Sequence, residues 1–314
     1  MAVSREALPV DRLVAGYNLL LALLWATLLP RAWYAPGVFA AHLAAAALPW
    51  LLGRLPDRPA RVVAVLRDFY PLLWLAAFWS EQDFLRRLLY VEANDAMIAP
   101  LDAAVFGTHP HAVWMPSMHA LWFSELMHFL YAAYYLLIFL PPLAVALAGR
   151  REALRDMTFR LLGAYIGCYL VYILFPVDGP VALGVPYPGP HTAGVFYRLV
   201  HSAEQAGGVL GAAFPSSHVV GAVTIAWLGW RWFTPGVAAL LSVEAAGVCL
   251  ATVYTQHHYA IDSAAGLAWG LALQGIVLPV VYRWLVPRAA RLPLRVRPAF
   301  APLRPAPRTS GGFR

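Results

Sequence analysis

The chain has 314 residues, of which 61% are hydrophobic and only 12% are charged. A soluble domain carries about 25% charged residues, so this composition excludes an ordinary soluble protein. The net charge of +7 comes from arginines that stand between apolar stretches and form no patch, which gives no support for a nucleic-acid partner. Cys168 and Cys249 both lie in apolar stretches, where we expect free thiols packed as small hydrophobic side chains and no disulfide.

Several apolar stretches reach about 20 residues, the length needed to cross a bilayer. We therefore predict an all-α polytopic membrane protein with about eight membrane helices. Arg67 and Asp68 interrupt the third stretch, which we interpret as an amphipathic entry followed by a short span from Phe69. The predicted helices cover residues 13–30, 36–53, 62–80, 121–147, 157–175, 215–233, 236–255 and 259–284.

These helices divide into regions of different character. Residues 1–60 hold two N-terminal membrane helices, and residues 61–284 form the main membrane region. Residues 285–314 are rich in Pro and Arg and cannot bury an apolar core, so we expect a disordered cytoplasmic tail. The first apolar stretch follows acidic residues and lacks a small-residue cleavage site, which argues against a signal peptide.

The placement of the arginines predicts the orientation, because cytoplasmic loops of membrane proteins are enriched in basic residues. With the N-terminus inside, the arginines that fall on the outer side are Arg31, Arg86, Arg87 and Arg198. Both termini are therefore predicted to be cytoplasmic, in an integral protein of a bacterial plasma membrane. The long segments 81–120 and 176–214 then face outward, and we expect a short interfacial helix at 195–206.

A histidine and an aspartate, His258 and Asp262, stand four residues apart at the predicted start of the last membrane helix. Positions i and i+4 share a helix face. A carboxylate on one imidazole nitrogen fixes the tautomer and makes the other nitrogen a better nucleophile. Such a pair could attack phosphorus and form a phosphohistidine. The alternative is a histidine and an aspartate that only satisfy each other's hydrogen-bonding groups in a helix interface. Burying ionisable side chains in a membrane costs free energy, which favours a functional role for the pair.

The segment Phe214-Pro215-Ser216-Ser217-His218 is predicted to open another helix on the same outer face. Proline suits the first helical turn because its missing N–H costs nothing there. Free backbone N–H groups and the hydroxyls of Ser216 and Ser217 predict an anion site suited to phosphate. His218 is placed to give a proton to a leaving oxygen and to take one back from an acceptor. The alternative is an ordinary serine-capped helix.

Together, Pro215-Ser216-Ser217-His218 and His257-His258-Tyr259-Ala260-Ile261-Asp262 resemble the type 2 phosphatidic acid phosphatase superfamily. The double histidine looks most like the inositol phosphorylceramide synthase branch, as do the stretches 125–135 and 175–180. The resemblance covers roughly residues 66–283 and makes 61–284 the expected catalytic membrane domain, with a six-helix core. It implies that His258 is the nucleophile, Asp262 its orienting residue and His218 the acid and base, with no metal and no other cofactor.

The sequence also departs from that pattern in its basic residues. Phosphatases of the superfamily carry a Lys-x6-Arg-Pro motif, which cannot occur here because the chain has no lysine, and Ala251 and Thr252 replace their Ser-Arg pair. A site poor in cations suits a singly charged phosphodiester better than a phosphomonoester. Arg198 is the expected phosphate contact from the long outer segment, and Arg86 or Arg87 could fold over the site and reverse this argument.

Further polar residues are candidates for contacts with an acceptor or substrate. We name His257, Asp178 and Tyr254 for this role because they accompany the motifs. Asp178 and Glu125 stand at the expected membrane edge, where they could bind hydroxyl groups of an acceptor or only satisfy neighbouring groups.

The stretch Pro116-Ser117-Met118-His119 repeats the proline-serine-histidine pattern ahead of a helix on the outer face. No His-x-x-x-Asp partner follows it, so we expect a helix cap or a contact at a substrate entrance. A metal site built from His109, His111 and His119 is conceivable, but this spacing matches no ligand pattern, and we expect none.

The implied function is transfer of a phospho-head group, for which phosphoinositol is one candidate, from a phospholipid to an alcohol acceptor. One alternative is a lipid phosphate phosphatase that acts on phosphatidic acid or a polyprenyl phosphate with water as the acceptor. The other alternative is a non-catalytic, lipid-binding membrane protein. The expected partners are the membrane and a phospholipid or lipid phosphate substrate.

Overall fold

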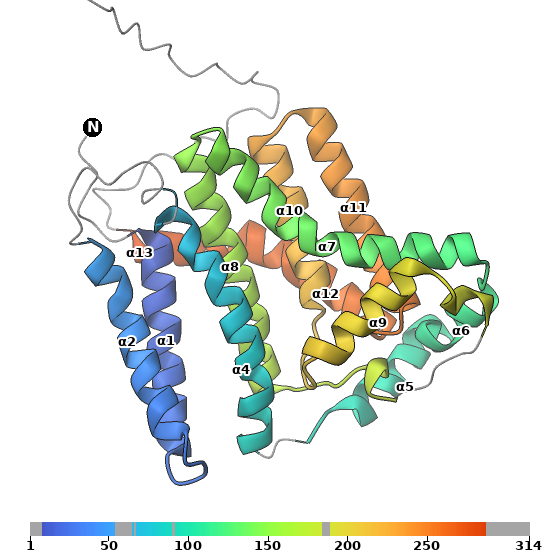
Figure 1. Ribbon diagram of the computed structural model, residues 1–314, viewed down its shortest axis with the longest axis horizontal. Coiled ribbons are helices and arrows are strands. Elements are labelled where there is room, and N and C mark those ends of the chain that lie inside the picture. Colours follow the sequence, from blue (N-terminus) through green and yellow to red (C-terminus); the bar gives the residue numbers. More distant parts are fainter. Residues whose placement is uncertain (1–7, 54–64, 66, 90–91, 184–188, 287–314) are drawn as a thin grey trace, which may run out of the picture.

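The computed structural model describes residues 8–53, 65, 67–89, 92–183 and 189–286, which form a bundle of helices (Figure 1). The main helices are α1 (Pro9–Leu28), α2 (Ala35–Gly53), α4 (Leu73–Leu89), α7 (Leu121–Leu147), α8 (Arg151–Leu174), α10 (Ser217–Trp232), α11 (Pro235–Tyr254), α12 (Ala260–Ala272) and α13 (Leu278–Leu285). The shorter helices α5 (Asp95–Phe106), α6 (Pro110–Ser117) and α9 (Val195–Gly207) gather at one end of the bundle. Among the described residues, the only β pairing is an isolated bridge between Val177 and Ala212, so the all-α prediction is confirmed.

The chain carries several helices long and apolar enough to cross a membrane. Among the described residues there are five: α1, α7, α8, α11 and the continuous helix Ala260–Leu285, in which a π-helical turn joins α12 to α13. The apolar part of α2, Ala35–Leu51, is slightly shorter. Helices α4 and α10 have 17 and 16 residues. An integral membrane protein fits these helices, whereas the number of about eight spans stays a prediction.

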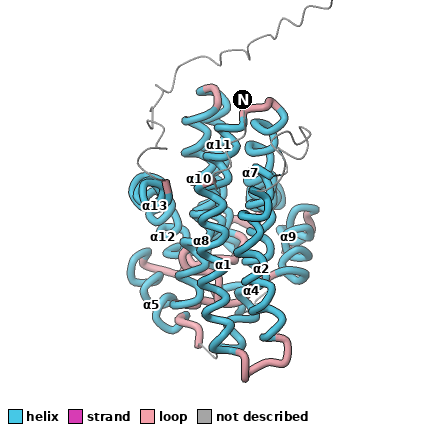
Figure 2. The backbone as a smooth tube through the Cα atoms, turned by 90° about the vertical axis from the view of Figure 1, so that its left-hand side faces the viewer, coloured by secondary structure: helices cyan, strands magenta, loops and turns pink. Residues whose placement is uncertain are grey.

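Helix α8 forms the centre of the bundle and contacts α1, α4, α7 and α10 (Figures 1 and 2). Of the apolar 18-residue stretch of α8 that could span a membrane, 67% is buried inside the protein. Tyr169 of α8 donates a hydrogen bond to the carbonyl of Leu75 in α4 at 3.1 Å. Tyr172, one turn later, donates to the carbonyl of Pro215 at 2.8 Å, immediately before α10. The two tyrosines therefore connect the N-terminal helices to the helix that carries His218.

The third predicted membrane helix ends later than the expected residue 80, since α4 continues to Leu89. The predicted outer segment 81–120 begins with Glu81. Instead Glu81 is buried, and its Oε1 accepts hydrogen bonds from Trp25 Nε1 at 2.5 Å and from His42 Nε2 at 2.9 Å. Partners on α1 and α2 thus allow an acidic side chain to stay inside the bundle. Residues 54–64, where the predicted regions 1–60 and 61–284 meet, lie outside the described residues.

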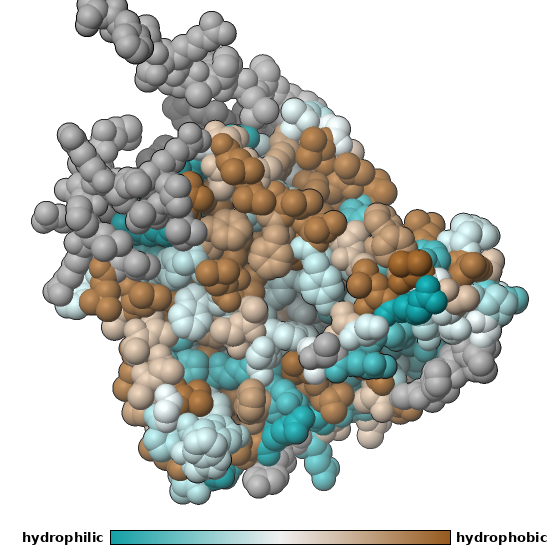
Figure 3. Space-filling view, viewed as in Figure 1, coloured by the Kyte–Doolittle hydropathy of each residue, from teal (hydrophilic) through white to brown (hydrophobic). Residues whose placement is uncertain are grey.

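The predicted outer segments are folded and not extended. Helix α9 confirms the short helix expected at 195–206, and α5 and α6 lie within the segment predicted at 81–120. Figure 3 shows apolar side chains over the upper part of the bundle and hydrophilic ones around α9 and the lower end. Residues 287–314 of the predicted tail lie outside the described residues.

Candidate active site

Helix α10 begins at the serine pair, which places His218 in its first turn. Ser216 caps the helix by accepting a hydrogen bond from the N–H of Val219 at 3.4 Å. The N–H of Ser216 donates to the carbonyl of Asp262 at 3.1 Å, and the N–H of Ser217 donates to Tyr172 Oη at 3.1 Å. The prediction that the backbone N–H groups of Ser216 and Ser217 are free to bind an anion is therefore wrong, because both groups already donate to protein partners.

The turn between α11 and α12 presents two histidines side by side. The carbonyl of Thr252 accepts hydrogen bonds from the N–H groups of His257 and His258, both at 3.1 Å. Gln256 adopts a positive φ of 65°, which reverses the chain direction within this short turn. His258 is 4% exposed, and the carbonyl of Ala213 lies within hydrogen-bonding reach of it.

The Asp262 carboxylate lies close to two residues of this turn, Tyr259 and His258. Its Oδ2 accepts a hydrogen bond from the N–H of Tyr259 at 2.9 Å, which caps the start of α12. The same oxygen lies 3.5 Å from Nδ1 of His258, longer than an ideal hydrogen bond but within ion-pair distance. Asp262 is fully buried, and its carboxylate is therefore fixed beside the imidazole that the sequence predicts it to orient.

The two motifs meet in space. The rings of His218 and His258 lie 5.7 Å apart between centroids, at an angle of 68°. The starts of α10 and α12 thus bring the two histidines into edge-to-face contact. Gly266 of α12 permits the approach, because a Cβ at this position would lie 2.8 Å from the carbonyl oxygen of Ser216.

A row of aromatic rings extends from the catalytic pair toward α9. Tyr131 lies 4.9 Å from the ring of His218 and stacks on His257 at 4.4 Å. The ring of His257 lies 6.0 Å from that of His201 on α9, which in turn lies 5.6 Å from His128. Nitrogens of His128, His201 and His257 are buried without hydrogen-bond partners. Buried polar atoms without a partner are uncommon in folded proteins, which makes this row a candidate for ligand contacts.

Burial keeps the histidines of this turn neutral. Desolvation lowers the pKa of His258 to about 4, against a smaller opposing effect from the Ala213 carbonyl. Desolvation, together with the neighbouring histidines, also lowers the pKa of His257, and burial lowers that of His201. A neutral His258 keeps the lone pair that a nucleophile requires.

The arginines of the predicted outer segments are paired with carboxylates or exposed. Arg86 pairs with Asp178 at 2.7 Å, and Arg87, 74% exposed, pairs with Asp83 at 3.0 Å. Arg198 is exposed on α9. In the part of the chain that the structure describes, no hydrogen bond or ion pair links an arginine to the rings of His218 and His258, so Arg198 is not brought to the site.

Two further candidate contacts have structural partners. Asp178 holds Arg86 through one oxygen, while its second oxygen is buried without a partner. Tyr254 is buried and donates a hydrogen bond to the carbonyl of Met118 at 2.8 Å, so it ties α11 to the end of α6. His257 lies in the aromatic row beside Tyr131, and the ring of Tyr254 lies 6.1 Å from His128 of the same row.

The side chains of Glu125 and His119 both have backbone partners. The carboxylate of Glu125 accepts three hydrogen bonds from the first N–H groups of α9, at 2.8, 3.1 and 3.0 Å, so it satisfies neighbours. His119 is exposed, and its Nδ1 lies 3.0 Å from the carbonyl of Pro116. No ring contact joins His119 to His218 or His258 among the described residues.

Sequence reasoning missed two carboxylates at the start of α12. Asp95 accepts hydrogen bonds from the N–H groups of Asp178 and Gly179 and from Tyr259 Oη, at 2.8, 2.9 and 3.2 Å. Asp102 Oδ1 accepts from the N–H of Ile261 at 2.9 Å. The acidic character of the segment 81–120 was the available signal, but only the fold shows that these residues reach the catalytic turn.

The arrangement defines a class of protein. A membrane helix bundle presents a histidine with an adjacent carboxylate, and a second histidine faces it from the start of a neighbouring helix. This set of side chains is of the kind used in phosphoryl transfer.

The comparisons agree with this class, since the model of the PAP2 superfamily matches residues 96–276, and the chain belongs to that superfamily. No curated protein and no solved structure matches the chain. The matched region contains His218, His258 and Asp262, and it excludes α1, α2 and α4. Membership indicates a lipid phosphatase or phosphotransferase type of activity.

Proposed function

We propose that the protein is a membrane lipid phosphotransferase. It moves a phospho-head group, with phosphoinositol as one candidate, from a phospholipid diester to an alcohol acceptor. The observation that carries this proposal is a His218–His258 pair that, among the described residues, has no hydrogen bond or ion pair to an arginine and lies next to a row of histidines with buried, unbonded ring nitrogens. The proposal is finer than the superfamily assignment, which also includes phosphatases.

In the first step, a ring nitrogen of His258 attacks the phosphorus of the donor lipid. A nitrogen–phosphorus bond forms, and the bond from phosphorus to the glyceride oxygen breaks. His218, carrying a proton, gives it to the departing oxygen, so that diacylglycerol leaves as a neutral alcohol. Asp262, 3.5 Å from His258 Nδ1, stabilises the positive charge that develops on the attacking ring.

In the second step, the hydroxyl oxygen of the acceptor attacks the phosphorus of the phosphohistidine. The nitrogen–phosphorus bond breaks, and the hydroxyl proton passes to His218, which returns to its starting state. The products are a new phosphodiester and free His258. With water in place of the alcohol, the same steps would release a phosphomonoester, so the acceptor decides between transfer and hydrolysis.

The scarcity of cations near the pair favours a diester substrate. A phosphodiester carries one negative charge, and a phosphomonoester near neutral pH carries between one and two. Cationic ligands stabilise the charge on the transferring group, and their absence penalises the more highly charged substrate. Arg86 is already neutralised by Asp178 at 2.7 Å. Carboxylates close to the turn, Asp95 and Asp102, add to the penalty.

The aromatic row supports an alcohol as the acceptor. Neutral imidazoles donate and accept hydrogen bonds without offering the charge that a phosphate dianion requires. His201 and His257 have pKa values lowered by burial and stand next to Glu204, whose Oε2 is 3.6 Å from Nε2 of His257. We propose that acceptor hydroxyls satisfy these nitrogens and lie beside His218.

We propose that the catalytic pair faces the outer side of a bacterial plasma membrane and that both termini are cytoplasmic. His218 lies in the first turn of α10, and Arg231 lies in its last turn. At 1.5 Å per residue, about 20 Å of helix separates these ends. Arg231 shares Asp156 with Arg160, so a basic cluster stands at the end away from the catalytic pair, as the positive-inside rule requires.

The direct test compares two substrate classes with the same purified full-length protein. One reaction contains phosphatidylinositol with an isotope-labelled diacylglycerol acceptor, and mass spectrometry measures labelled phosphatidylinositol. The other contains phosphatidic acid, and a colorimetric assay measures released phosphate. His258→Ala is the inactive control, and His119→Ala is a matched histidine variant away from the pair.

Faster transfer on the diester, lost in His258→Ala and retained in His119→Ala, would support the proposal. Fast release of phosphate from phosphatidic acid without transfer would establish the phosphatase alternative. A folded protein that binds lipid but turns over neither class, with further head groups tried, would favour the non-catalytic alternative.

A further inference from the structure

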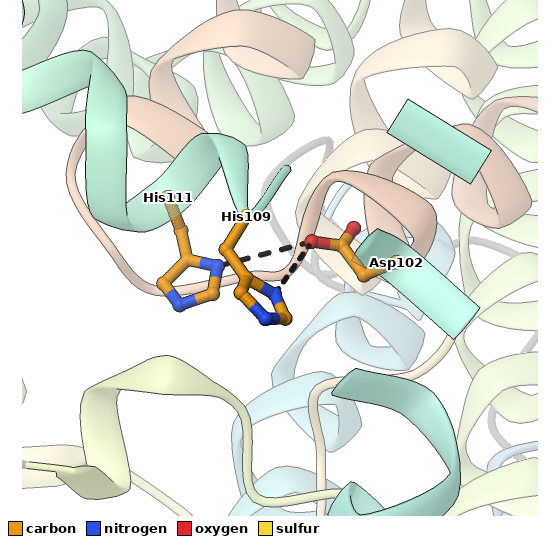
Figure 4. Close-up of side chains that lie close together, drawn as sticks. All are labelled: Asp102, His109 and His111. Atoms are coloured by element: carbon orange, nitrogen blue, oxygen red, sulfur yellow. Dashed lines mark ion pairs between the residues drawn. The ribbon is translucent and has the colours of Figure 1, made fainter. Parts of the chain in front are cut away.

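Asp102, His109 and His111 bring three ligand atoms together outside the catalytic pair (Figure 4). Nδ1 of His109 and Nδ1 of His111 lie 3.8 and 3.9 Å from Oδ2 of Asp102. The carboxylate comes from α5, whereas His109 caps α6 and His111 lies in its first turn. Figure 4 shows both rings turning a nitrogen toward the same carboxylate oxygen.

All three atoms lack a hydrogen-bond partner. Oδ2 of Asp102 and both Nδ1 atoms are buried and make no hydrogen bond, their nearest polar approaches being the 3.8 and 3.9 Å separations within the cluster, and the Asp102 side chain is 0% exposed. A buried carboxylate oxygen without a partner is costly. The other oxygen of Asp102 is occupied, since it accepts the N–H of Ile261 at 2.9 Å. The free oxygen is therefore held in place and directed at the two imidazoles.

We propose that Asp102, His109 and His111 bind one divalent transition-metal ion, with Zn²⁺ as the best-suited ion. Two imidazole nitrogens and one carboxylate oxygen are ligands that Zn²⁺ prefers, whereas Ca²⁺ and Mg²⁺ prefer oxygen ligands alone. Ligands bound at about 2.0–2.1 Å around a tetrahedral ion lie about 3.3 Å from one another. Closing the observed gaps requires small side-chain rotations. His109, 45% exposed, leaves room for water as a fourth ligand.

The site would act as a clamp on the catalytic turn. Asp102 contacts the backbone at Ile261, next to Asp262. The ring of His111 lies edge-on to Tyr259 at 5.1 Å, and its carbonyl accepts a hydrogen bond from Gln256 Nε2 at 3.2 Å. A metal ion would therefore fasten α5 and α6 to the residues that flank His258. These three residues are positioning residues and take no part in the phosphoryl-transfer steps.

Metal binding is tested on the full-length protein purified in detergent with a tag that contains no histidine. The protein is stripped with a chelator, exposed to Zn²⁺, passed through a desalting column and assayed for metal by mass spectrometry. We expect about one equivalent of Zn²⁺ per chain and a thermal midpoint several degrees higher than in the stripped protein. Co²⁺ should give the visible absorption of a four-coordinate site.

The variants identify the ligands. His109→Ala and Asp102→Asn should lose the bound equivalent and the thermal shift, whereas the exposed His119→Ala should keep both. Asn retains an oxygen to accept the Ile261 N–H, and His109→Ala decides the matter if Asp102→Asn does not fold. The proposal is overturned if the wild-type protein retains less than a tenth of an equivalent, or if His109→Ala keeps the equivalent of the wild type. These readouts do not depend on the proposed phosphotransferase activity.

Discussion

Replacing Asp262 with Asn probes the proposed role of the carboxylate with little change of shape. Asp262 Oδ2 accepts the Tyr259 N–H at 2.9 Å and lies 3.5 Å from His258 Nδ1. Asn keeps an oxygen for the cap and loses the charge. At 3.5 Å and an effective dielectric constant of about 20, the interaction with a positive imidazole is worth about 5 kcal/mol. This corresponds to about three and a half powers of ten in rate.

We therefore expect Asp262→Asn to slow phosphotransfer by about 10²- to 10³-fold, since the amide recovers part of the interaction. Single-turnover formation of the phosphohistidine, followed by acid-quench mass spectrometry, measures the affected step directly. A thermal midpoint within a few degrees of the wild type would show that the cap survives. A rate within about three-fold of the wild type would refute the orienting role of Asp262.

Further predictions concern the histidines, the acid response and the helix contact. His258→Ala should abolish any covalent phosphoenzyme. His218→Ala should slow departure of the leaving group, and its activity should recover when the substrate is a nitrophenol ester, whose leaving group needs no proton. Equal loss of activity on the lipid and on the nitrophenol ester would contradict the acid role of His218. Because burial lowers the pKa of His258 to about 4 from an ordinary value near 6.5, the unfolded state binds more protons between these values. Stability should therefore fall as pH decreases from about 6.5 to 4, by about 3 kcal/mol from this group, and less so in His258→Gln, as measured by chemical denaturation. Gly266→Ala should lower the thermal midpoint by several degrees, because its Cβ would meet the Ser216 carbonyl at 2.8 Å, whereas Gly275→Ala, with its closest neighbour at 3.9 Å, should not.

The sequence predicted the helices because apolar stretches of membrane length have few alternatives. The all-α class, the helix at 195–206 and the helix starts that carry His218 and Asp262 were all accessible from composition and spacing. The predicted end of the third helix was wrong, because α4 continues to Leu89 with Glu81 buried inside the bundle. Its partners, Trp25 and His42, lie 56 and 39 residues away in the chain, so no local pattern contains them.

The candidate site was predictable in its motifs and not in its surroundings. The i, i+4 spacing of His258 and Asp262 implies proximity on any helix. Whether a backbone N–H of the motif is free to bind phosphate depends on partners from other helices, which the local sequence does not contain. The N–H of Ser217, for example, donates a hydrogen bond to Tyr172 Oη on α8. Likewise, Arg198 was a reasonable phosphate ligand by position, but the face of α9 that it occupies leaves it exposed.

The carboxylates around α12 connect the two proposals. Asp95, Asp102 and Asp262 all accept hydrogen bonds from residues 259–261, at the end of the helix where the dipole favours negative charge. The helix end compensates part of that charge, and no arginine contacts it in the described structure. A phosphate dianion entering beside Asp262 therefore meets repulsion that a diester meets more weakly. A divalent ion on Asp102 would offset one of these charges, so metal loading should raise the tolerance for a monoester relative to a diester.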